Sequence, residues 1–200
     1  MSAGESPSPE ELGVDRLEAL NHALSRQVGW SSDFQQEYLP VGMTFGEEVA
    51  GRVWLAWPDR ALFHTGDPAE RLMGMKGRLV RLVDLADGTC DEHQLTDREW
   101  ERVPLAAILD PRGAAVHFGV LAVGGSDLVL TPKEAGGVDR VEITLGTDGL
   151  PVRVVIIDPQ GAENRLSFGR WTSGEGPPEG RWLPAPPSGV ECLADRGALD

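Results

Sequence analysis

Histidine and cysteine are the side chains in this 200-residue chain best suited to metal binding and acid–base chemistry. The histidines are scattered, with no His-Glu-x-x-His or comparable metal spacing, and the cysteines cannot form a Cys-x-x-Cys site: His22, His64, His93, His117, Cys90 and Cys192. His117 lies between Val116 and Phe118 on a predicted strand, which favours a surface or pocket-rim position over a catalytic base. These residues predict no metal centre.

Other motifs that could indicate a catalytic or nucleotide-binding site also favour a structural interpretation. Gly74 and Gly77 lack the third glycine and the strand–helix context of a dinucleotide loop, and there is no Walker lysine. Ser188 lies in a proline-rich segment rather than a nucleophile elbow. Asp148 and Asp158 fall in predicted turns, where aspartate stabilises the backbone. We therefore expect no catalytic residues, no cofactor and no enzymatic activity.

The two cysteines, Cys90 and Cys192, leave two redox states open. A disulfide between them is possible in an oxidising compartment, but their spacing alone cannot establish it. We expect two free thiols.

The composition limits the class of protein. The net charge of −14 argues against nucleic acid and against electrostatic docking to anionic lipid, since both require basic patches. No apolar run approaches the roughly 20 residues of a membrane-spanning helix, so we expect no stable membrane insertion. The length suits one domain, over residues 8–193, between a disordered lead (1–7) and a flexible tail (194–200). The acidic first residues do not form a signal peptide, which leaves a cytoplasmic location open.

An amphipathic helix is predicted near the N-terminus. Ser8 and Glu11 have the spacing of a capping box, and Pro9 suits the first helical position. Apolar residues follow at helical spacing: Leu17, Leu20, Leu24 and Val28. The predicted helix covers residues 9–28.

The rest of the chain alternates as strands do. In the strand over 49–57, Val53, Leu55 and Trp57 share one face, and Arg52 and Trp54 lie on the other. Further strands are predicted at 33–38, 61–65, 78–84, 114–123, 128–131, 138–146, 151–157 and 163–171, with a short helix at 103–109 and either a lid or a strand at 73–75. Many strands and few helices predict a mainly β, α+β fold with one large antiparallel sheet and helices gathered on one face. Such a sheet curls, which leaves room for a ligand cavity.

Five motifs, in this order along the chain, resemble the LolA family of periplasmic lipoprotein carriers: Phe34-Gln35-Gln36, the segment 51–58, Leu130-Thr131-Pro132-Lys133, Asp148-Gly149-Leu150-Pro151 and the segment 186–190. The resemblance implies an incomplete β-barrel whose concave face is covered by the N-terminal helix and short internal helices. It also implies an apolar cavity. Its candidate lining residues are Val53, Leu55, Trp57, Phe63, Leu128, Leu130, Val141, Ile143, Leu166, Phe168 and Trp182.

One position departs from the family pattern. The residue before the conserved proline is an arginine in the family, where it helps to hold the lid closed, and here it is Trp57. Arg60 would point elsewhere and is not expected to substitute for it.

The resemblance further implies a periplasmic carrier, expected here as a monomer, that moves the acyl chains of lipoproteins or other lipids between membranes. Its partners would be an ATP-driven (ABC-type) release complex of the inner membrane and an acceptor of the outer membrane. The alternative is a LolA-like sensing or protein-interaction module that binds a lipid or a regulatory partner without transport.

Overall fold

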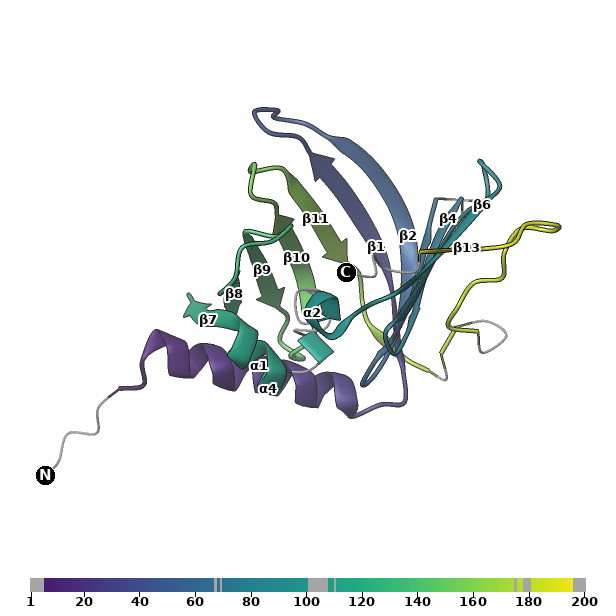
Figure 1. Cartoon of the computed structure of the whole chain (residues 1–200). Coiled ribbons are helices and arrows are strands. Elements are labelled where there is room, and N and C mark those ends of the chain that lie inside the picture. Colours follow the sequence, from purple (N-terminus) through teal and green to yellow (C-terminus); the bar gives the residue numbers. More distant parts are fainter. Residues whose placement is uncertain are drawn as a thin grey trace, which may run out of the picture.

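A computed structural model describes residues 6–66, 68, 70–100, 108–109, 111–174, 176–177 and 181–195. One unclosed, almost wholly antiparallel sheet dominates it (Figure 1). The helices are α1 (Pro9–Ser25), α2 (Asp97–Trp100) and α4 (Pro111–His117). The strands are β1 (Trp30–Leu39), β2 (Glu47–Ala56), β3 (Arg60–Thr65), β4 (Arg71–Lys76), β5 (Leu79–Asp84), β6 (Thr89–Gln94), β7 (Phe118–Val123), β8 (Asp127–Pro132), β9 (Arg140–Leu145), β10 (Pro151–Ile157), β11 (Glu163–Phe168), β12 (Thr172–Ser173) and β13 (Leu193–Asp195).

The sheet consists of two meanders joined by one long-range strand pair. Strands β1 to β6 follow one another as hairpins, and so do β7 to β11. The two halves meet where β1 pairs with β11, with Phe34 opposite Phe168. The result is the mainly β, incomplete barrel that the sequence predicts, with β7 and β13 at its two ends.

Helix α1 begins with the predicted capping box. The Glu11 amide donates to Ser8 Oγ at 3.2 Å, and the Ser8 amide donates to Glu11 Oε2 at 2.8 Å. Leu17, Leu20 and Leu24 are fully buried against the sheet. The helix ends at Ser25 rather than at residue 28, since its C-cap is the next residue.

One face of the sheet packs against the helices and carries the main core; we call it the helix-covered face. In β2, Val53 and Leu55 point into this core, whereas Trp54 and Ala56 belong to a separate cluster on the opposite face. This is the alternation expected for the strand, except at Trp57. That residue follows β2, and 42% of its surface is exposed.

The connection before β7 differs from the sequence prediction. Residues 111–117 form helix α4, and the strand predicted over 114–123 begins only at Phe118. His117 is therefore the last residue of a helix and is not on a strand. The apolar run over 114–123 is long enough to contain the end of this helix and the whole of strand β7. Most of the short helix predicted over 103–109 falls outside the described residues; Ile108 and Leu109 are helical and buried.

The expectation of two free thiols was wrong. Cys90 and Cys192 form a disulfide, with their Cα atoms 4.5 Å apart. They meet because β13 runs parallel to β6, with Leu193 beside Asp91. The segment 181–195, which we call the strap, thus lies along the β2–β6 half of the sheet.

Residue packing fixes the strap to the face opposite the helices. Trp182 packs with Trp54 and Leu62, and its ring lies under the Arg60 guanidinium, 5.3 Å away. A Cβ on Gly74 would lie 2.3 Å from the Trp182 carbonyl oxygen, so the strap crosses β4 at a position that only glycine fits. Within the described part of the chain, no helix is both long and apolar enough to cross a membrane.

Candidate functional site

Most of the predicted cavity residues lie on the helix-covered face. Six of them are buried in the main core: Val53, Leu55, Leu128, Leu130, Val141 and Ile143. Phe63, Leu166 and Phe168 are partly buried and pack against that core. The structure therefore brings these residues onto one continuous apolar surface.

Two predicted residues lie elsewhere. Trp182 belongs to the strap and packs on the opposite face, where it contacts Trp54 and Leu62. Trp57 lies beyond the end of β2 at the α1 end of the sheet, outside the main core. Neither residue contributes to the apolar surface of the helix-covered face.

The apolar surface remains open at the end of the sheet away from α1. Strand register places Phe63 opposite Met73 and Met73 opposite Leu82, so these three side chains share the helix-covered face. Phe63 and Met73 are half-buried, and Leu82 is 49% exposed. We call these three residues the open strip.

A pocket of about 390 Å³ lies over the open strip and includes Met73 and Leu82 in its lining. Its volume falls in the range of roughly 300–1,000 Å³ that is typical of small-molecule sites. Sequence reasoning missed Met73 and Leu82 as lining residues, although their alternation in β4 and β5 carried the signal.

The rim of this pocket is polar and fixed. Arg71 Nε donates to Asp84 Oδ2 at 3.0 Å, and Asp84 Oδ1 accepts the amides of Ala86 and Asp87, each at 3.0 Å. These hydrogen bonds, together with the Arg71 charge, lower the pKa of the Asp84 carboxyl. The pocket thus offers an apolar floor beside a charged pair, an arrangement that suits an amphiphile with an apolar body and a polar head.

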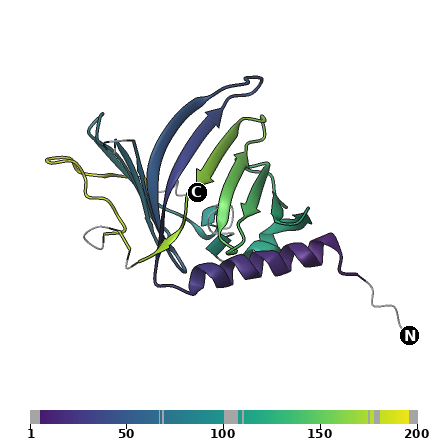
Figure 2. The ribbon, with the colours of Figure 1, turned by 180° about the vertical axis from the view of Figure 1, so that it is seen from behind.

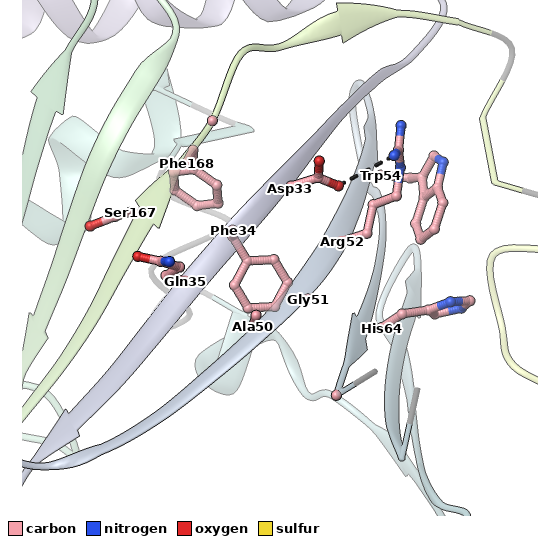
Figure 3. A pocket seen from close by; sticks show the side chains of 12 residues that line it. Asp33, Phe34, Gln35, Ala50, Gly51, Arg52, Trp54, His64, Ser167 and Phe168 are labelled. Carbon is pink, nitrogen blue, oxygen red and sulfur yellow. Dashed lines mark hydrogen bonds and ion pairs between the residues drawn. The ribbon is translucent and has the colours of Figure 1, made fainter. Parts of the chain in front are cut away.

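A second pocket, of about 700 Å³, opens over β1, β2, β3 and β11 (Figure 3). Arg52 Nη1 lies 3.3 Å from Asp33 Oδ1, and its guanidinium lies 5.6 Å from the centre of the Trp54 ring. The Trp54 and His64 rings meet edge-on at 4.9 Å. Partial burial lowers the pKa of His64, which favours the neutral form of its ring.

The second pocket lies on the other side of the sheet from the open strip. Asp33, Arg52 and His64 occupy register positions opposite in direction to Phe34, Val53 and Phe63. Gln35 and Ser167 continue it toward a smaller hollow of about 290 Å³ that is lined in part by Arg153 and Arg165. Its polar side chains were not predicted as a site, since Arg52 was predicted only to point away from Val53.

The residues that the structure describes include no group of three or more histidine, cysteine, aspartate or glutamate side chains placed to hold a metal ion. Each pocket holds one arginine–aspartate pair, Arg71 with Asp84 and Arg52 with Asp33, and Asp91 also lines the smaller pocket. Both pockets therefore have the character of binding sites with fixed charges.

One comparison with known proteins identifies a family. The model described as outer membrane lipoprotein carrier protein LolA matches residues 27–180, which include both pockets and exclude helix α1 and the strap. No curated protein sequence matches the chain.

Among solved structures, an uncharacterized conserved protein from Thermus thermophilus is 14% identical with a TM-score of 0.54, over 90% of this chain and 97% of that one. The MucA/MucB complex of Pseudomonas aeruginosa is 21% identical with a TM-score of 0.48, over 86% of this chain and 61% of that one. A LolA superfamily protein from Nitrosomonas europaea is 10% identical with a TM-score of 0.47, over 82% of this chain and 94% of that one. At these identities the likeness concerns the fold.

Proposed function

Because this chain belongs to the LolA outer membrane lipoprotein carrier family, we propose that it binds an acyl chain on the helix-covered face of its sheet. One observation carries the proposal: Met73 and Leu82 line a pocket of about 390 Å³ and remain partly exposed, on the same face as Phe63, which packs against the buried apolar core. Covering half-exposed apolar side chains with a ligand stabilises the complex by about 25 cal/mol per Å² of apolar surface removed from water.

The ligand enters with its chain toward the core and its polar head near Arg71 and Asp84. Each buried methylene contributes about 0.8 kcal/mol, so a 16-carbon chain gains on the order of 12 kcal/mol on leaving water. A bilayer offers the same gain. A carrier of this design therefore depends on an ATP-driven complex at the donor membrane and on an acceptor at the target membrane.

We place this activity in the periplasm and assign the chain a carrier role rather than a catalytic one. The family description supports the location, and so does the Cys90–Cys192 disulfide, because disulfides persist in oxidising compartments. The single charge pair at the pocket supports the carrier role, since a paired Arg71 and Asp84 serve to orient a head group.

A binding assay with a soluble fluorescent fatty acid tests the proposal. The purified protein is expected to bind the probe saturably, and native mass spectrometry is expected to find acyl species retained from the producing cells. Leu82→Gln removes apolar surface from the open strip without filling the pocket. We expect it to weaken binding about tenfold, which is a loss of about 1.4 kcal/mol.

Leu121→Gln is the matched control. Leu121 is 39% exposed, and it lies on β7 with its side chain directed away from the core that Phe118 and Val120 enter. The control is expected to bind the probe as the unmodified protein does. Equal affinities for all three proteins would contradict a site on the open strip, and an unmodified protein that ignores the probe would contradict acyl binding altogether.

A second candidate function is binding of a regulatory protein without lipid transport. The pocket on the opposite face supports it, because Asp33 and Arg52 are exposed there and form a polar surface over the buried Trp54 ring, which suits a protein partner. Under this alternative, Arg52→Ala would abolish partner binding and leave the fatty-acid assay unchanged.

A further inference from the structure

The β1–β2 hairpin carries a cluster of exposed apolar side chains. Its tip, residues 38–46, reads Tyr-Leu-Pro-Val-Gly-Met-Thr-Phe-Gly and contains no charged residue, in a chain of which 25% is charged. Phe45 is 75% exposed, Val41 57% and Met43 54%. We call these three residues the tip cluster. Contiguous exposed apolar side chains of this kind mark contact sites.

The tip is a defined structure. The Met43 amide donates to the Pro40 carbonyl at 3.1 Å, which closes the turn. A Cβ on Gly46 would lie 1.9 Å from the Tyr38 carbonyl oxygen, so the two arms of the hairpin approach too closely there for any residue except glycine. The apolar side chains are therefore presented outward by a backbone that is held at both ends.

The hairpin stands at the end of the sheet opposite helix α1, and it projects beyond the neighbouring strands (Figures 1 and 2). The pocket over the open strip lies toward this same end, because its lining includes Thr65, Arg71 and Asp84, at the ends of β3, β4 and β5 away from α1. Tyr38, which is 48% exposed, shares the face of Phe34 and so stands between the tip and the helix-covered face.

We propose that the tip cluster is a membrane-contact element that inserts into a bilayer of zwitterionic lipid. This inference rests on the proposed function, because the tip lies at the same end of the sheet as the pocket that would take the acyl chain. Val41, Met43 and Phe45 enter the interface between head groups and acyl chains, and Tyr38 lies at head-group level, where aromatic residues with a polar end are favoured.

The negative charge of the protein favours a bilayer without net charge over an anionic one. Glu47 and Glu48 follow the tip cluster directly and are exposed, and the whole chain carries a net charge of −14. An anionic surface repels these charges across a Debye length of about 8 Å at physiological salt. The uncharged tip therefore fits a bilayer without net charge, and added anionic lipid is expected to weaken binding at low ionic strength.

Vesicle flotation tests the proposal. The unmodified protein is expected to float with vesicles of pure phosphatidylcholine. At low salt, vesicles with 30% phosphatidylglycerol are expected to bind it several-fold less, and raised salt is expected to remove the difference. The variant Val41→Ser/Met43→Ser/Phe45→Ser changes only exposed side chains and is expected to lower the partition coefficient tenfold or more.

A control variant carries Val28→Ser and Val116→Ser, because these side chains are 76% and 64% exposed and lie away from the hairpin. It is expected to bind vesicles as the unmodified protein does. The soluble fatty-acid assay runs in parallel, and the tip variant is expected to keep full affinity there. That result separates failure of membrane contact from failure of acyl binding.

The proposal is overturned if the unmodified protein does not float with zwitterionic vesicles, or if the tip variant floats as well as the control. Either result would show that the exposed tip is not a membrane-contact element. It would also be overturned if anionic lipid strengthened binding, since a basic surface would then be responsible.

Discussion

Removing the Cys90–Cys192 disulfide should destabilise the whole domain. The perturbation is the double variant Cys90→Ala/Cys192→Ala. Alanine is chosen because Cys90 is 2% exposed and a serine would bury a hydroxyl group there. The bond joins residues 102 positions apart, so it constrains more than half of the unfolded chain.

The magnitude follows from loop closure. In the chain-entropy model, a cross-link that closes a loop of about 100 residues stabilises the folded state by about 4.7 kcal/mol at 25 °C. Measured values are often smaller because the unfolded chain retains structure. We therefore expect the double variant to lose about 3–5 kcal/mol of unfolding free energy, a large part of the total for a domain of this size.

Urea unfolding followed by far-UV circular dichroism measures this loss. The variant should show a lower midpoint and a larger m-value, because an unfolded chain without the cross-link exposes more surface. The unmodified protein in reductant should behave in the same way. A loss below about 1 kcal/mol, or an unchanged m-value, would refute the view that the bond acts on the unfolded state. Limited proteolysis within residues 181–195 should also become faster in the variant, since the strap loses its covalent anchor.

Two further predictions concern the face opposite the helices. Gly74→Ala should cost about 1–3 kcal/mol of unfolding free energy, because the new Cβ would collide with the backbone of Trp182, whereas Gly125→Ala, with no atom within 4 Å, should be nearly neutral in the same urea experiment. Burial lowers the pKa of His64, so the unfolded chain takes up its proton at a higher pH than the folded one, and stability should fall as the pH drops below about 6.5. His64→Gln should reduce this dependence, measured as the difference in urea midpoint between pH 7.5 and 5.5, and an unchanged difference would place the effect on another group.

Local features of the fold could be predicted from the sequence. The capping box at Ser8 and Glu11, the alternation in β2 and the turns after residues 146 and 158 all depend on interactions between residues a few positions apart. The resemblance of five motifs, in their order along the chain, also indicated the family, which the family model over residues 27–180 confirms. The prediction was wrong where local patterns are ambiguous. The apolar run over 114–123, predicted as one strand, forms the end of helix α4 and then strand β7, and helix α1 ends three residues before its predicted end at residue 28.

For the candidate site, too, the features that depend on local alternation could be predicted, and those that depend on distant segments could not. Alternation correctly placed Val53 and Leu55 on one face and Trp54 on the other. It could not show that Trp182 returns to the face opposite the helices, because that position depends on a strap that crosses β4 at Gly74. The partial exposure of Met73 and Leu82 was equally hidden, since it depends on where the helices stop covering the sheet.

By itself, the sequence determined most of the elements and their faces, because these follow from spacing along the chain and from the turn chemistry between strands, and the resemblance of its motifs indicated the family. Only the tertiary structure decided the pairing of β1 with β11, the disulfide between residues 102 positions apart, and which part of the apolar face stays open. Each of these joins segments far apart in the chain. The physical reason is that such contacts are selected by the packing of the whole sheet, and a local pattern of side chains is compatible with several of them.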